Sequence, residues 1–329
     1  MTVENIPTRS PGVTAHVMTM QDGANVSLIV TDDCAIAVDL PMQASELADW
    51  RAGMSGVTNK PLRWIIFTSP ERVSGDTLKL LAPVDKPAPK VIGVPTIIQD
   101  AGFTQLFAAL EAAQPRSPEP LSAFELRKRG ILPEFTFSEK MTLAAGSQPV
   151  NIEILHVGGV MPGSSFVFAR EAGLVFAGDH IAIDDPPVLY ANSDLDKWID
   201  ALTAIQHDKK LSILIPGRGK SHDAGAIAIT LEFLKNARAG LRRLAKAGKG
   251  RDAVASLVPG LMAIYHGKNT ASAPAVSGSN AYTFSVAGQS LQLGLEQLYD
   301  QLVRQIATET QNSELRTQNA ENGHPQQDL

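Results

Sequence analysis

The stretch "RWIIFTSPERVSGD", residues 63–76, decides how the chain is interpreted. Its apolar residues Trp64 to Phe67 predict a buried strand, and the polar residues that follow predict a loop at the end of that strand. Loops in this position often carry functional side chains, because a rigid strand holds them in place. This loop contains Ser69, Glu71 and Arg72, but no histidine of the kind that would indicate a metal site.

The composition predicts a globular protein with a large core. The chain has 329 residues, of which 44% are apolar and 19% are charged. The net charge of −5 argues against nucleic acid as a partner, and the basic stretch 238–249 is interpreted as the solvated face of a helix. Cys34 is the one cysteine, which excludes an internal disulfide and a zinc site built from thiolates.

The ends and the hydropathy of the sequence indicate where the protein resides. The first residues lack the charged and apolar regions of a signal peptide. No stretch approaches 18 uninterrupted apolar residues, so we expect no membrane association and a cytoplasmic location.

Strand-like and helix-like segments alternate in blocks along the chain. Short β-branched segments separated by turn signals precede helical stretches, and this order is then repeated, which favours a layered α/β protein. We expect a flexible N-terminus (1–12), one α/β domain (13–222), a C-terminal helical extension packed on it (223–307) and a disordered tail (308–329).

Four further sequence features lie at the predicted ends of strands. They are the opening pair "NVSLIV" and "AIAVD", which ends in Asp39, and the stretches "HVGGVMPGSSFVF" (156–168), "LVFAGDHI" (174–181) and "ILIPGRGK" (213–220). Each has a simple explanation as a turn or a cap when it is considered alone. The seven histidines show neither H-x-H nor H-x-x-x-H spacing, so they contain no pair typical of a metal centre.

Together and in this order, these motifs resemble those of the metallo-β-lactamase superfamily. The loop at 68–76 resembles T-H-x-H-x-D-H-x-x-G, and the later three resemble G-G-H-T-P-G-S, F-x-G-D and P-G-H-G. The resemblance covers roughly residues 13 to 260 and implies a four-layer αβ/βα sandwich of two mixed β-sheets with outer helices. It also implies one or two metal ions, usually zinc, that activate a hydroxide at the strand ends.

The residues at the metal-ligand positions depart from the superfamily pattern. An ungapped alignment puts Ser69 and Glu71 at the first two histidines, whereas a two-residue deletion puts Glu71 and Arg72 on the aspartate and histidine of D-H. In either alignment, Val160 stands at the histidine of G-G-H-T-P-G-S and Arg218 at the histidine of P-G-H-G. Among the metal-ligand positions, only the aspartate of F-x-G-D is kept, as Asp179. Valine cannot bind a metal and arginine repels one, so the scaffold is interpreted as retained and the metal centre as lost.

Three functions follow from this interpretation. The leading one is a metal-free pseudoenzyme, or a protein that binds a small anionic ligand in the old cleft and uses no cofactor. Its candidate cleft residues are Ser69, Glu71, Arg72, Asp76, Val160, Asp179, His180, Arg218 and His222. The second is a hydrolase of esters, lactones or thioesters with one zinc or iron ion held by some of His156, Asp179, His180 and His222. The third is a structural or partner-binding protein that acts through its C-terminal helices.

Two structural expectations complete the sequence-based account. Arg218, with or without Arg72, is expected to occupy the space of the metal and to pair with Asp179. Apolar residues at helical spacing between 289 and 307 are expected to dock on the domain or on a second subunit, which would make the protein a homodimer. These residues are Leu291, Leu295, Leu298, Leu302 and Ile306.

Overall fold

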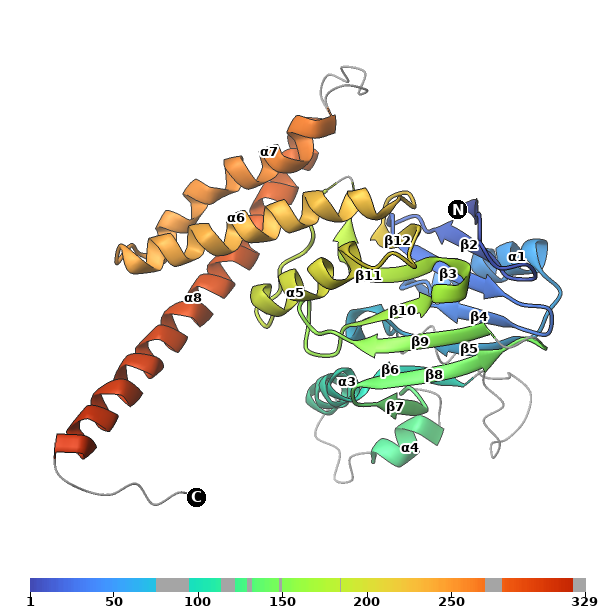
Figure 1. Ribbon diagram of the computed structural model, residues 1–329, viewed down its shortest axis with the longest axis horizontal. Helices are drawn as coiled ribbons and strands as arrows, with labels where there is room; N and C mark the ends of the chain where they lie inside the picture. The colour runs from blue at the N-terminus through green and yellow to red at the C-terminus, as the bar shows by residue number, and fades with distance from the viewer. Residues whose placement is uncertain are drawn as a thin grey trace. The chain divides into compact units, whose positions relative to one another are not determined.

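The computed structural model describes residues 1–74, 95–113, 122–128, 132–147, 150–183, 185–269 and 280–321. The chain divides into two units. The first comprises Met1–Pro187 and Asn192–Leu234, and the second comprises Val188–Ala191 and Lys235–Leu329. Figure 1 shows the strands and the helices of both units. No helix in the described residues is long and apolar enough to cross a bilayer.

Two mixed β-sheets form the first unit (Figure 1). In the described residues, the larger sheet has the order β1 (Thr2–Ile6), β2 (Thr14–Thr19), β3 (Asn25–Val30), β4 (Ala35–Val38), β5 (Leu62–Ile66), β6 (Thr96–Gln99) and β7 (Phe135–Phe137). The smaller sheet has the order β12 (Ile213–Arg218), β11 (Leu174–Ala182), β10 (Ser165–Ala169), β9 (Val150–His156) and β8 (Lys140–Ala145).

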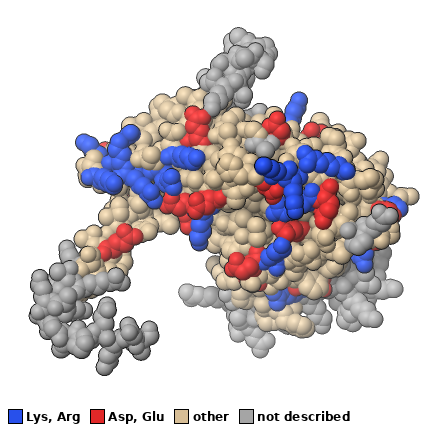
Figure 2. Space-filling model, in the orientation of Figure 1, with Lys and Arg blue, Asp and Glu red and all other residues tan. Residues whose placement is uncertain are grey.

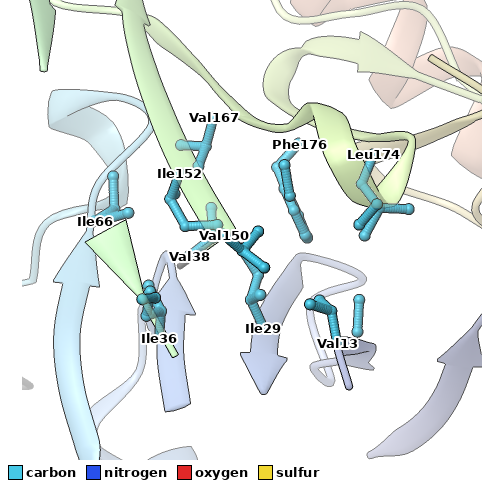
Figure 3. Packing of buried hydrophobic residues seen from close by; sticks show 14 of the residues in the cluster. Val13, Ile29, Ile36, Val38, Ile66, Val150, Ile152, Val167, Leu174 and Phe176 are labelled. Atoms are coloured by element: carbon cyan, nitrogen blue, oxygen red, sulfur yellow. The ribbon is translucent and has the colours of Figure 1, made fainter. Parts of the chain in front are cut away.

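The two sheets are held together by the side chains that alternate along each strand. In β4, Ile36 and Val38 face the smaller sheet, whereas Ala35 and Ala37 pack with the helices on the other side. Figure 3 shows Ile36, Val38 and their neighbours meeting Val150 and Ile152 of β9 between the sheets. The core between the sheets therefore follows from the two-residue period of the strands.

Helices cover the outer faces of both sheets. On the larger sheet, α1 (Leu47–Val57) buries Leu47 and Trp50, and α3 (Asp100–Ala113) adds Phe103 and Leu106. On the smaller sheet, α5 (Leu195–Gln206) buries its apolar stripe, which includes Trp198. A short helix, α4 (Ala123–Lys128), precedes β7. These layers confirm the predicted αβ/βα sandwich.

Short 3₁₀ segments complete the first unit. They are η1 (Ala44–Glu46), η2 (Pro70–Arg72), η3 (Arg170–Ala172) and η4 (Ala224–Ala226). The last of them leads into α6 (Ile227–Lys246), whose residues from Lys235 onward belong to the second unit.

The second unit contains three further helical segments, η5 (Arg251–Leu257), α7 (Val258–Asn269) and α8 (Asn280–Glu321). The α8 helix packs against η5 and α7 with Leu291, Leu295 and Leu298, which are buried. Leu302 is half-buried and Ile306 is exposed, so the first part of the predicted apolar stripe forms the contact. Ion pairs from Arg251 to Glu296 and Asp300 add a polar rim.

Both chain ends differ from the sequence-based expectation. Residues 1–12 were expected to be flexible, but β1 pairs antiparallel with β2 and buries Ile6. The tail from Thr308 was expected to be disordered, but α8 continues to Glu321. No proline or glycine interrupts 308–321, and its Ala, Glu, Gln and Arg residues favour helix, so the helix continues although its residues are polar. The stretch "AYTFSVAG", expected as a strand or packed loop, is also part of α8.

Candidate functional site

The ends of β4 and β5 place an aspartate and a threonine next to each other. Asp39 follows β4 directly and adopts a left-handed backbone with φ of 63°, while its N–H donates to the Ile66 carbonyl at 2.8 Å. Its carboxylate accepts hydrogen bonds from the Thr68 backbone N–H at 2.8 Å and from the Thr68 hydroxyl at 2.7 Å. These bonds connect the two parallel strands at their carboxyl ends.

The loop after β5 aims an arginine across to the smaller sheet. Ser69 caps η2 by accepting a hydrogen bond from the Glu71 N–H at 3.3 Å, and Pro70 occupies the first position of the turn. This turn directs the Arg72 side chain inward, where only 3% of it is exposed. The loop whose sequence resembles a metal-binding motif therefore holds a buried arginine, Arg72, which is a positive charge of the protein itself.

Arg72 forms a bidentate ion pair with Asp179 of β11. Its Nε donates to Asp179 Oδ2 at 3.0 Å, and its Nη2 donates to the other carboxylate oxygen. Nη2 also donates to the Gly217 carbonyl at 3.0 Å at the end of β12. A single guanidinium thus joins the end of β5 in one sheet to β11 and β12 in the other, with the planar geometry that suits a carboxylate.

Two glycines make room for this arrangement. A Cβ atom on Gly178 would lie 2.3 Å from the Thr68 hydroxyl oxygen, and φ of this residue is +52°. A Cβ atom on Gly217 would lie 2.6 Å from Arg72 Nη2. The glycines of "FAGDH" and "PGRG" therefore allow the close approach of the two sheets around the ion pair.

Charges in this cluster are strongly coupled. Burial raises the pKa of Asp39 to about 6, although Arg72 and the hydrogen bonds from Thr68 act in the opposite direction. Burial disfavours the charged guanidinium, but the carboxylates of Asp179 and Asp39 outweigh it, so the pKa of Arg72 lies above its usual value. Burial and the nearby charge of Asp179 also raise the pKa of Glu71. The arginine is therefore a permanent positive charge shared by two carboxylates.

Arg218 does not take the place that the sequence suggested for it. Its side chain is exposed, and its Nη1 donates to the backbone carbonyl of Asp22. The register between β11 and β12 shifts after Gly178 and sets Arg218 opposite Ala182, beyond Asp179 along β11. The predicted Arg218–Asp179 pair is therefore wrong, and the partner of Asp179 is Arg72.

The histidine candidates are not brought together around Asp179. His180 follows Asp179 on the strand and points to the opposite side, where its ring packs against Phe166 and Trp198. Its two ring nitrogens lie 2.9 Å from the Ala177 carbonyl and 2.8 Å from the Gly158 carbonyl. His180 is therefore a core residue of the sandwich, and its burial lowers its pKa.

His156 and His222 also have separate surroundings. His156 Nε2 lies 2.7 Å from the Pro162 carbonyl in the loop after β9. His222 is exposed, and its backbone pairs with Leu214 near the start of β12, at the other end from Gly217. In the described part of the chain, no three His, Cys, Asp or Glu side chains come together to hold a metal.

The remaining candidates divide into core and loop residues. Val160 is fully buried, and its carbonyl accepts a hydrogen bond from Ser193 at 2.7 Å. Ser69 is buried and acts as a cap, while Glu71 is exposed beside Asp179. Asp76 lies outside the described residues. The sequence-based list missed Thr68 and Asp39 as members of the site, although an aspartate directly after the buried strand "AIAV" was a signal for the latter.

Comparison with known proteins identifies the fold. No family model matches the sequence, and no curated protein matches it. The structure is similar to the metallo-β-lactamase from Pontibacter korlensis, with a TM-score of 0.53, 17% identity and coverage of 71% of this chain and 100% of that one. The chain has the metallo-β-lactamase fold.

Two further solved structures agree with this assignment. DIM-1 metallo-β-lactamase exposed to ceftazidime has a TM-score of 0.52 and 15% identity, with coverage of 71% of this chain and 97% of that one. Metallo-β-lactamase FIM-1 from Pseudomonas aeruginosa, in a mono-zinc form, has a TM-score of 0.50 and 17% identity, with coverage of 72% and 96%. At these identities the similarity shows the fold alone.

The residues of this chain do not fit the zinc ions that the fold implies. Zinc binds three or four nitrogen, sulfur or oxygen ligands at about 2 Å. Asp179, which the sequence resemblance puts at a ligand position, accepts hydrogen bonds from Arg72 at both of its oxygens. Val160 has no donor atom, and a guanidinium beside the carboxylate repels a second cation.

Proposed function

We propose that this protein is a metal-free member of the metallo-β-lactamase fold that acts by binding a ligand and not by metal-dependent hydrolysis. The observation that carries the proposal is the bidentate contact of Arg72 with Asp179, together with its hydrogen bond to the Gly217 carbonyl. A fixed guanidinium supplies the positive charge that balances the buried carboxylates, a role for which other members of the fold use metal.

The ligand that suits this end of the sandwich is a small anion. Arg218 ends β12 directly after Gly217, and its guanidinium is exposed. Its hydrogen bond to the Asp22 carbonyl uses one of five donors, so the others are available for a carboxylate or phosphate group. In this proposal Arg72 keeps the scaffold closed and Arg218 receives the ligand.

Metal analysis and an activity panel test the first half of the proposal. Purified protein dialysed against a weak chelator is expected to hold no stoichiometric zinc or iron. It is also expected to show no chelator-sensitive hydrolysis of fluorogenic esters, lactones and thioesters. One equivalent of zinc or iron, with hydrolysis that the chelator abolishes, would contradict the proposal and favour the hydrolase with one metal ion.

Calorimetric titration with inorganic phosphate and acetate tests the second half. Binding of either anion is expected to be at least tenfold weaker in Arg218→Gln. Arg63→Gln serves as a control, because it removes the same charge from an exposed arginine at the start of β5. Equal binding by the wild type and Arg218→Gln would show that Arg218 is not the anion site.

A further inference from the structure

Asn25 joins the two sheets beside the anion site proposed at Arg218. It is the first residue of β3 in the larger sheet and is 3% exposed. Its side-chain nitrogen donates to the Pro216 carbonyl at 2.9 Å and to the Gly219 carbonyl at 2.7 Å. These two carbonyls flank Gly217 and Arg218, so one buried amide holds the turn that bears Arg218 from both sides.

The neighbours of Asn25 determine the orientation of its amide group. Carbonyl oxygens only accept hydrogen bonds, so the amide nitrogen must face Pro216 and Gly219. The Thr19 hydroxyl can donate, and it does so to Asn25 Oδ1 at 3.0 Å. All three partners therefore agree on one orientation, in which the amide nitrogen uses both of its N–H groups on the turn.

The turn before β3 holds the guanidinium group of Arg218 as well. Arg218 Nη1 donates to the Asp22 carbonyl, and the backbone of Arg218 pairs with that of Ala24. Asp22 is itself fixed, because its carboxylate accepts a hydrogen bond from the Ala24 N–H at 2.9 Å. The turn at 22–24 therefore holds the tip of the arginine, while Asn25 holds the backbone on either side of it.

We propose that Asn25 is the positioning residue that presents Arg218 to an anion with at least two oxygen atoms on one centre. With Nη1 held by the Asp22 carbonyl, the parallel N–H groups of Nε and Nη2 form an edge that suits a carboxylate or a phosphate. A halide ion responds to the positive charge but not to the spacing of two donors. This inference rests on the anion site proposed above, and it names the residue that gives the site its selectivity.

Pre-organisation is the physical reason why the turn affects affinity. An arginine loses rotamer freedom when it binds a ligand, and a site that already holds the side chain avoids much of that cost. Figure 2 shows basic and acidic side chains interspersed over one face of the first unit, so charge alone gives little selectivity there. Without the Asn25 amide, the Pro216 and Gly219 carbonyls lose their buried donor. The charge of Arg218 would remain, but its direction would no longer be fixed.

Titrations of the intact chain with acetate and with chloride test the proposal, because the two anions carry the same charge. The backbone amide signals of Gly219 and Lys220 in nuclear magnetic resonance spectra follow the binding. Asn25→Ala is expected to weaken acetate binding about fivefold and to change chloride binding by less than about twofold. A residue that only supported the fold would not change the ratio of the two affinities.

Gln99→Ala is the matched control. Gln99 is another buried amide of the larger sheet, 4% exposed, and its nitrogen donates to the Ser138 carbonyl at 3.0 Å. Its replacement is expected to destabilise the first unit to an extent similar to that of Asn25→Ala and to leave acetate binding unchanged. Circular dichroism and urea unfolding check that both variants are folded.

The outcomes separate this inference from the proposed function on which it rests. Acetate affinity that is unchanged in Asn25→Ala but weaker in Arg218→Gln would overturn the role of Asn25 and leave the anion site in place. Equal acetate affinity in the wild type and Arg218→Gln would overturn both. An equal loss of acetate affinity in Gln99→Ala, or an equal loss of chloride affinity in Asn25→Ala, would also overturn the inference, because Asn25 would then act through stability alone.

Discussion

Arg72 donates from Nε to Asp179 Oδ2 at 3.0 Å and from Nη2 to the second carboxylate oxygen, across the interface between the two sheets. Arg72 is 3% exposed and the Asp179 side chain 19% exposed, so the pair is nearly shielded from water. Removing one member of such a pair is costly because it leaves the other charge buried without a partner. The predictions for the first unit follow from this relationship.

Replacement of Arg72 should destabilise the first unit far more than replacement of Arg218. Arg72→Met is expected to lower the free energy of unfolding by about 3 kcal/mol, the low end for a buried pair because Asp179 retains some contact with solvent. Arg218→Met, at an exposed position, is expected to change it by less than about 0.5 kcal/mol. Urea unfolding monitored by tryptophan fluorescence measures both. Equal effects of the two variants would show that the role assigned to Arg72 is wrong.

Asp39 should make stability depend on pH. Its pKa is about 6 in the folded protein against 3.8 for the unperturbed group, so the folded protein binds this proton more tightly than the unfolded chain. The contribution of Asp39 is therefore fully present below pH 4 and is lost as the pH rises through 6, by up to about 3 kcal/mol.

Asp39→Asn isolates this contribution from other titrating groups. The free energy of unfolding of the variant, relative to that of the wild type, is expected to rise between pH 4 and pH 7 by that amount. Urea titrations at several pH values give the comparison. Parallel pH profiles for the two proteins would mean that Asp39 does not titrate in this range.

Gly178 should not tolerate a side chain. In Gly178→Ala the Cβ atom would meet the Thr68 hydroxyl, and the residue would also be held at a positive φ, so we expect a loss of more than about 2 kcal/mol. Gly56→Ala in α1 is the control, because no atom lies within 4 Å of the added Cβ and alanine favours helix by about 1 kcal/mol. Thermal unfolding should shift down for the first variant and slightly up for the second; an unchanged midpoint for Gly178→Ala would contradict the close approach of Thr68.

Leu295 should anchor α8 in the second unit. This side chain is fully buried, and Leu295→Ala is expected to cost about 2–5 kcal/mol of stability in that unit. Leu315→Ala, farther along the same helix at an exposed position, should have little effect. Hydrogen exchange of α8 amides distinguishes them: faster exchange in both variants, or in neither, would contradict the assigned packing.

The sequence predicted the sandwich well because its signals are local. Alternation in strands such as Val150–His156 and the glycine turns at the strand ends occur in the order that the fold requires. Strands with few buried residues were harder to find. β1 buries only Ile6, and β8 is an edge strand with one buried residue, Ala145. Each is an edge strand that pairs with the next strand along the chain, β1 with β2 and β8 with β9, and edge strands bury few of the apolar side chains that mark a strand in the sequence.

The pairing inside the candidate site could not be predicted from the sequence. The sequence resemblance puts Asp179 at a metal-ligand position and no histidine at the others, and this alignment stays a prediction. The same resemblance aligns Arg72 and Arg218 with ligand positions, and the sequence does not contain the direction of either side chain. The capped turn at η2 aims Arg72 inward, and the register shift in β12 moves Arg218 outward.

A double-mutant cycle between Arg72 and Asp179 tests the central claim most directly. The free energy of unfolding is measured in urea with a chelator present for the wild type, Arg72→Met, Asp179→Leu and the double variant. If the guanidinium takes the place of a metal, the double variant should be more stable than Arg72→Met, with a coupling energy of about 1.5 kcal/mol or more. A coupling energy near zero in the presence of the chelator would contradict the claim, because the two residues would then not stabilise each other.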